Sequence, residues 1–101
     1  MVRSRARSVR SVARIFVAAG DAHRLRLLVL LLQSPMSIGE LARATGRTVS
    51  LVAQQMRVLR DARLVKGTRE GRQIVYAILD RRTHRLLDTC LWHAIQSGSA
   101  R

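Results

Sequence analysis

The fold is decided by residues 37–62, which read SIGELARATGRTVSLVAQQMRVLRDA. Ser37 and Glu40 have the spacing of a capping box, in which a serine hydroxyl and a glutamate carboxylate each bind a free backbone N–H at the start of a helix. Gly46 predicts a tight turn after this short helix, and Thr48 is a suitable N-cap for a second helix that runs to the end of the stretch. Two helices joined by a tight glycine turn are typical of a helix-turn-helix.

The second of these helices has one apolar and one polar side. Val52, Met56 and Leu59 fall together on the apolar side. At 100° per residue, the polar side chains fall within about a 60° arc on the opposite side; they are Ser50, Gln54, Arg57 and Asp61. We therefore expect the apolar side to pack into a core and the polar side to face solvent.

Two helices are expected before this stretch. The first covers about residues 8–19 and has an apolar side and a basic side, and Gly20 is expected to end it in the left-handed conformation that suits glycine after a helix. Asp21 can cap the second, residues 22–33, whose leucines point in all directions, as in a helix buried at the centre of a small domain. The arginines at helical spacings along one side of the first helix are Arg3, Arg7, Arg10 and Arg14.

A β-hairpin and a last helix are expected after residue 62. Residues 64–78 predict two strands around a turn at Glu70 and Gly71, with cations at its tip. Asp80 can cap a helix over about residues 81–96, which carries a continuous apolar stripe. The predicted fold class is therefore mainly α with a small β-hairpin, in the order of a winged helix-turn-helix: four helices, the hairpin and a fifth helix.

The length of the chain predicts one domain. Its 101 residues leave little interior to divide, so we expect a single domain over residues 1–98 and a disordered tail over residues 99–101. The longest apolar run, residues 27–32, is far shorter than the roughly 20 residues that a bilayer span needs, and no secretory signal is recognisable. A single cysteine, Cys90, fits a reducing compartment. We therefore expect a cytoplasmic protein without a membrane partner.

The charge balance predicts a polyanionic partner. The chain has 19 Lys plus Arg against 6 Asp plus Glu, a formal net charge of +13. All of these cations except Lys66 are arginines, whose planar fork suits phosphate oxygens and guanine edges. A genome that favours arginine codons would explain part of the preference for arginine over lysine, but little of the net charge. Nucleic acid is therefore favoured over a membrane surface.

If the partner is double-stranded DNA, the polar helix is expected to contact bases and the hairpin to contact the flanking backbone. The major groove of B-DNA admits one α-helix, and the N-terminal half of such a helix usually reaches the base edges. The candidates for base contacts are Thr48, Ser50 and Gln54, of which Gln54 is the best because its amide can pair bidentately with adenine. The candidates for phosphate contacts around this helix are Arg43, Arg47, Arg57 and Arg60. The candidates on the hairpin, along the flanking backbone, are Lys66, Arg69 and Arg72.

Four segments of the sequence form an ordered set: AHRLRLL at residues 22–28, SIGELA at 37–42, QMRVLRDARLV at 55–65 and EGRQIVY at 70–76. In their order and spacing they resemble the ArsR/SmtB family of bacterial regulators, and the resemblance covers about residues 18–96. It implies a homodimer built from the first and last helices, which binds an inverted-repeat DNA operator, usually as a repressor that an effector releases. The predicted reading helix departs from the family pattern at Val49, Leu51 and Ala53, so the site is expected to be read partly through thymine methyl groups or DNA shape.

The resemblance also implies a metal effector, because many relatives bind Zn, Ni or Co between the paired last helices. The matching positions here are Asp80, Arg82, His93 and Gln96; arginine and glutamine are poor ligands, so the usual tetrahedral site is expected to be disabled. The favoured interpretation makes Asp80 a helix cap, His93 a surface or interface residue and Cys90 a core residue. The alternative is a variant site for Ni or Zn across the dimer, built from Asp80, His84, Cys90 and His93.

Two other classes of function are weighed against DNA binding. A basic RNA-binding or ribosome-associated protein would also suit the charge, but single-stranded RNA modules stack bases on exposed aromatic rings, and this chain has only Phe16, Tyr76 and Trp92, on separate elements. An enzyme is not expected. No grouped nucleophile, base and acid, glycine-rich phosphate loop or HExxH motif is present.

Overall fold

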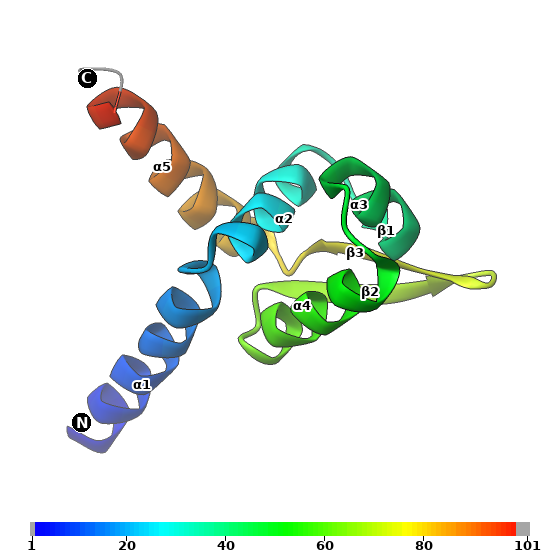
Figure 1. Cartoon of the computed structure of the whole chain (residues 1–101). Helices are drawn as coiled ribbons and strands as arrows, with labels where there is room; N and C mark the ends of the chain where they lie inside the picture. The colour runs from blue at the N-terminus through cyan, green and yellow to red at the C-terminus, as the bar shows by residue number, and fades with distance from the viewer. Residues whose placement is uncertain (1, 99–101) are drawn as a thin grey trace.

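The computed structural model describes residues 2–98, and within them the side chains of residues 5–97. The predicted disordered tail, residues 99–101, lies outside the described residues. The elements follow in the order α1 (Val2–Ala19), α2 (Ala22–Gln33), β1 (Met36–Ser37), α3 (Ile38–Thr45), α4 (Val49–Asp61), β2 (Val65–Glu70), β3 (Gln73–Ile78) and α5 (Arg81–Gly98) (Figure 1). The predicted helices and hairpin are all present, and α1 begins at Val2 rather than near residue 8 because no glycine or proline interrupts the N-terminal sequence.

The helices and the hairpin share one core. The apolar side of α4 is buried as predicted, with Val52, Met56 and Leu59 each 0% exposed. Side chains from α2, α3 and the first strand of the hairpin meet it there. The largest fully buried side chains of this core are Leu27, Leu28, Leu41, Val52, Met56, Leu59, Leu64 and Val65. Because α4 is anchored by one side only, its other side faces away from the core.

The sheet has one strand more than the sequence predicted. The hairpin pairs Val65 with Ile78 and Glu70 with Gln73, and Gly71 takes the left-handed conformation (φ 66°) in its turn. β1 lies on the other edge of β3, with Met36 opposite Tyr76. A strand of two residues is too short to show an alternating pattern, so its existence depends on the tertiary pairing rather than on local sequence.

Gly20 ends α1 for a different reason from the one predicted. The described glycines with positive φ are Gly46 and Gly71, so the prediction of a left-handed Gly20 was wrong. A Cβ at Gly20 would instead lie 2.8 Å from the carbonyl oxygen of Phe16. Glycine is therefore required there by close backbone contact, not by its φ.

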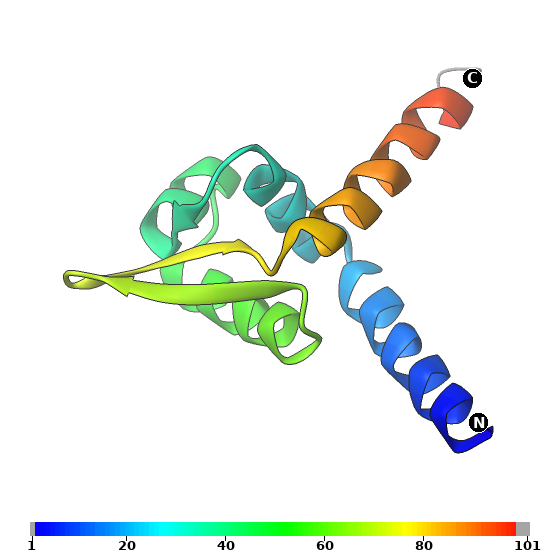
Figure 2. The same cartoon turned by 180° about the vertical axis from the view of Figure 1, so that it is seen from behind.

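The terminal helices project from the body. Figures 1 and 2 show α1 and α5 leaving on the side opposite the tip of the hairpin, and diverging from each other. In both views α1 runs past α4, whereas α5 runs away from it. Among the described helices, none combines the length and the apolarity that crossing a membrane requires.

Candidate nucleic-acid interface

The capping box and the glycine turn fix where α4 begins. Ser37 Oγ accepts a hydrogen bond from the Glu40 backbone N–H (3.2 Å), and the Glu40 carboxylate accepts one from the Ser37 N–H (2.9 Å), as predicted. Gly46 closes α3 in the left-handed conformation (φ 69°). Thr48 Oγ1 accepts from the Leu51 N–H (3.1 Å) and caps α4. The hydroxyl proton of Thr48 therefore stays available for another acceptor, while its lone pair holds the helix end.

All the side chains predicted to face DNA are exposed. Ser50 and Gln54 lie on the outer side of α4, opposite the buried Val52 and Met56. Their surroundings are cationic, since exposed arginines come from α3, the turn and the second half of α4. These are Arg43, Arg47, Arg57 and Arg60. An open polar helix side framed by cations is the arrangement that major-groove binding requires.

The structure brings two of the three hairpin cations together at the tip. Arg69 lies opposite Ile74 in the last pairs of the ladder, and Arg72 is in the turn beside Gly71. Lys66 pairs with Ala77 at the other end of the hairpin, where it lines a groove that also contains Asp80 and His84. The tip thus carries Arg69 and Arg72, and Lys66 lies at the base.

Sequence reasoning missed the arginine that ties α1 to α4. Arg24, on α2, donates from Nε to the carbonyl oxygen of Ala18 (2.7 Å) and from Nη1 to Gln55 Oε1 (2.9 Å). A weaker contact runs from Nη2 to the carbonyl of Val17 (3.4 Å). Gln55 follows the predicted base-reading Gln54, so the same fork holds both the end of α1 and the middle of α4. No local signal marks this contact.

Three of the chain's carboxylates accept hydrogen bonds at the starts of helices, and each has a lowered pKa. The backbone N–H of Arg24 lowers the pKa of Asp21, and the Ser37 backbone N–H and hydroxyl lower that of Glu40. Hydrogen bonds from the Thr83 backbone N–H and side chain lower the pKa of Asp80. The interpretation of Asp80 as a cap is confirmed.

The proposed metal ligands lie along α5 without meeting within one protomer. Among the described residues, no group of three or more His, Cys, Asp or Glu side chains gathers closely enough to hold a metal ion. Nε2 of His84 lies 2.9 Å from the carbonyl oxygen of Leu32, and His93 is exposed. Cys90 is exposed as well, so its prediction as a core residue was wrong for the single chain.

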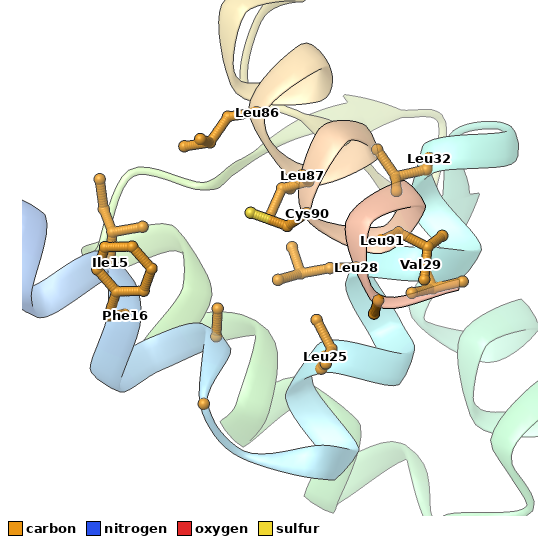
Figure 3. A pocket seen from close by; sticks show the side chains of 13 residues that line it. Ile15, Phe16, Leu25, Leu28, Val29, Leu32, Leu86, Leu87, Cys90 and Leu91 are labelled. Carbon is orange, nitrogen blue, oxygen red and sulfur yellow. The ribbon is translucent and has the colours of Figure 1, made fainter. Parts of the chain in front are cut away.

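An apolar groove of about 230 Å³ opens between α1, α2 and α5. Figure 3 shows Phe16, Leu28, Leu87 and Cys90 among the side chains that line it. Phe16 is 64% exposed, and Leu25 of α2 is 44% exposed. The prediction that α2 is buried on all sides was therefore wrong for the isolated protomer. Leu86, which also lines the groove, is 47% exposed. Further exposed apolar side chains on the terminal helices are Val9, Val12, Trp92 and Ile95.

Comparisons with known proteins agree with this geometry. The profile of the family described as "Bacterial regulatory protein, arsR family" matches residues 21–66. The chain is 40% identical to the HTH-type transcriptional regulator NmtR of Mycobacterium tuberculosis over 83 residues, which cover 82% of this chain and 69% of NmtR. It is 39% identical to a transcriptional repressor SmtB homolog of Synechocystis, covering 68% of this chain and 52% of that protein. The chain thus spans about half the length of the latter relative.

A solved structure shares the whole architecture. It is the homodimeric winged helix-turn-helix DNA-binding domain of a possible ArsR-family transcriptional regulator from Mycobacterium bovis, with a TM-score of 0.92 and 27% identity over 96% of this chain and 90% of that one. Relatives of this kind are transcriptional regulators, not enzymes, and none supports the RNA-binding alternative. The chain belongs to the ArsR/SmtB family of winged helix-turn-helix, DNA-binding transcriptional regulators.

Proposed function

We propose that this chain is a sequence-specific regulator that binds an inverted-repeat operator as a homodimer and acts as an effector-responsive repressor. The observation that carries the proposal is the outer side of α4, where Ser50 and Gln54 are exposed among Arg43, Arg47 and Arg57. With α4 in the major groove, Thr48, Ser50 and Gln54 would meet base edges, and the surrounding cations would bind phosphates. Arg69 and Arg72 at the tip of the hairpin, with Lys66 at its base, would lie along the flanking backbone.

The dimer in this proposal uses α1 and α5. Monomeric proteins rarely leave a continuous apolar surface open, and the groove between α1, α2 and α5 continues into exposed apolar side chains on both terminal helices. A two-fold pairing through these helices would put the two hairpin tips at opposite ends of the dimer. Two α4 helices related by such an axis match the symmetry of an inverted repeat. A regulator of operator DNA works where the chromosome lies, so we expect it in the cytoplasm.

Replacing Gln54 by alanine tests base reading. A duplex selected by the wild-type protein from genomic fragments should bind Gln54→Ala more weakly by about 1 to 3 kcal/mol, because alanine cannot form the bidentate amide hydrogen bonds, while binding to random duplex should change little. Fluorescence anisotropy at fixed salt measures both. Gln33→Ala, an exposed glutamine at the end of α2, is the matched control. Equal losses of affinity for selected and random DNA would contradict base reading by Gln54.

For the effector, the residues exclude one metal site and leave another to test. The usual set does not fit, since Arg82 and Gln96 take two of its positions. The variant set of Asp80, His84, Cys90 and His93 has one supporting feature. Nε2 of His84 must donate to the Leu32 carbonyl (2.9 Å), which leaves Nδ1 with the lone pair that a metal needs. We propose that Asp80 and His84 of one protomer and Cys90 and His93 of the other bind a transition metal ion such as Ni or Zn.

Metal binding is measured first without DNA. Equilibrium dialysis against Ni or Zn should give bound metal in proportion to dimer, and His84→Gln and His93→Gln should each weaken it by about 10-fold or more. Replacing His23, which lies on α2 and outside the proposed set, by glutamine is the control. Addition of the same metal to the protein–DNA complex should then release the DNA. No metal bound by the purified dimer would end the metal proposal and leave the DNA-binding proposal intact.

A further inference from the structure

A basic stripe runs along α1 outside the predicted DNA-binding surface. It consists of Arg7, Arg10 and Arg14, all exposed. At 100° per residue these three fall within about a 60° arc, and their Cα atoms are separated by rises of about 4.5 and 6 Å along the helix axis. The first acidic residue of the chain is Asp21, after the helix has ended. The stripe is therefore a row of like charges without a carboxylate on its own helix.

Such a stripe destabilises the helix that carries it. Like charges at i,i+3 and i,i+4 each cost a few tenths of a kcal/mol. The chain has little acid with which to offset this, because Asp21, Glu40 and Asp80 accept hydrogen bonds at the starts of helices and Asp61 lies 3.9 Å from Arg60. Its formal charge stays at +13. A polyanion is the partner that would turn this repulsion into attraction.

The stripe lies on the side of the molecule where α4 is. Arg10 and Arg14 line a groove of about 560 Å³ between α1 and the end of α4, together with Val58 and Asp61. Figures 1 and 2 both show α1 running past α4, with α5 going the other way. Arg57 and Arg60 are exposed on the same second half of α4 whose Val58 and Asp61 border this groove.

We propose that Arg7, Arg10 and Arg14 bind the phosphate backbone of the operator between its two half-sites. This inference rests on the proposed homodimeric operator binding. Because α1 leaves the body opposite the hairpin tip, pairing through α1 and α5 puts the stripe near the two-fold axis and the tips outside. In this proposal the three arginines contact phosphates and not base edges, so the stripe adds affinity and fixes half-site spacing without sequence preference.

The amphipathic character of α1 also suits an anionic membrane surface, but the apolar side argues against it. Val9, Val12 and Phe16 continue the groove that the proposed dimer covers, so they would not be free to enter a lipid headgroup layer. The arginines alone then remain available, next to α4. Vesicles are therefore one arm of the test.

The test compares two triple variants of equal charge. Arg7, Arg10 and Arg14 are changed to glutamine in one, and Arg81, Arg82 and Arg85 of α5 in the other; glutamine keeps a similar helix propensity. Two probes are used: the selected genomic duplex, and the same duplex in which neutral methylphosphonates replace the phosphates between the half-sites. The slope of log K against log salt should become shallower by about 0.9 for each phosphate that the α1 variant no longer binds, up to about 5 per dimer. The α5 variant should keep the slope of the wild type.

The methylphosphonates locate the phosphates that the stripe binds. They should weaken the wild type and the α5 variant by 10-fold or more, yet leave the α1 variant nearly unchanged, because this variant has no arginine left to bind those phosphates. If the α1 variant keeps the salt dependence of the wild type, the inference is overturned, while operator binding stands. If the wild type binds the selected duplex no better than random DNA, the proposed function itself is refuted. Sedimentation must show both variants dimeric, and dissociation of the α1 variant would mean that the stripe pairs with the partner subunit. If the α1 variant loses binding to phosphatidylserine vesicles while its DNA binding is unchanged, the inference is also refuted.

Discussion

Arg63 holds a backbone conformation that usually belongs to glycine. Its φ is 62°, and among the described residues it is the only non-glycine residue with a positive φ. The residue follows Ala62, the C-cap of α4; its N–H donates to the Arg60 carbonyl (2.9 Å), and the N–H of Leu64 donates to the Leu59 carbonyl (3.0 Å). These bonds satisfy the free carbonyls of the last turn, as in glycine-ended helices. A side chain in this conformation costs about 1 to 2 kcal/mol.

Arg63→Gly should therefore stabilise the protein. We expect the free energy of unfolding to rise by about 0.5 to 1 kcal/mol, since the relief of strain exceeds the extra freedom of glycine in the unfolded chain. Urea unfolding followed by circular dichroism measures it. The reciprocal control is Gly46→Ala, at φ 69° with no atom within 4 Å of the added Cβ, which should lose about 1 kcal/mol through conformation alone. A loss of stability in Arg63→Gly would show that the arginine side chain makes a compensating contact.

At the scale of elements, three helix starts depend on ionised carboxylates. The pKa values of Asp21, Glu40 and Asp80 are lowered by the hydrogen bonds that their helix N-termini donate. A carboxyl group with a lowered pKa in the folded state stabilises that state fully above its pKa in the unfolded chain, about 4. This contribution is lost as the pH falls through the lower, folded value. α2, α3 and α5 should therefore all weaken in acid.

The pH profile of stability checks this. The free energy of unfolding should be flat near pH 6 to 7 and fall progressively below about pH 4.5. Asp80→Asn should flatten part of that fall at little cost at pH 7, because asparagine caps a helix as well as aspartate does. Asp88→Asn leaves all three caps in place and is the control. A profile of Asp80→Asn that matches the wild type from pH 7 to pH 3 would contradict the role of the ionised cap.

The elements that could be predicted from the sequence are those that local chemistry determines. The capping box at Ser37, the turn at Gly46 and the buried side of α4 follow from residues within a few positions of one another. Contacts between distant residues left no such signal. β1 depends on pairing with β3, and Arg24 meets Gln55 across 31 positions of sequence. Every side chain predicted to face DNA is exposed. The role proposed for the basic stripe of α1 could not be predicted from the sequence, because it depends on the position of α1 beside the end of α4.

At the scale of the whole molecule, two errors of sequence reasoning, those on Cys90 and on α2, share one cause. Cys90 was expected in the core and α2 was expected to be covered on all sides, because their apolar patterns are those of buried helices. In the protomer both instead border an open apolar groove. A pattern of hydrophobic residues predicts burial in the assembled protein. Cys90 and α2, which are open in one protomer, therefore support an assembly with a second copy of the chain.

Phe16 is the residue that tests the assembly. It is 64% exposed in the protomer, lines the apolar groove, and would be buried twice in a two-fold dimer. Burying a phenylalanine contributes about 1.5 to 3 kcal/mol, so Phe16→Ser should weaken dimerisation by about 3 to 6 kcal/mol, or roughly 10² to 10⁴ in Kd. Analytical ultracentrifugation over a concentration series measures the shift. Val49→Ser is the matched control, since Val49 is 56% exposed but lies on α4, and its Kd should equal that of the wild type. If the wild type sediments as a monomer at micromolar concentration, or if both variants change Kd equally, then α1 is not the dimer surface, and the spacing of the two α4 helices needs another origin.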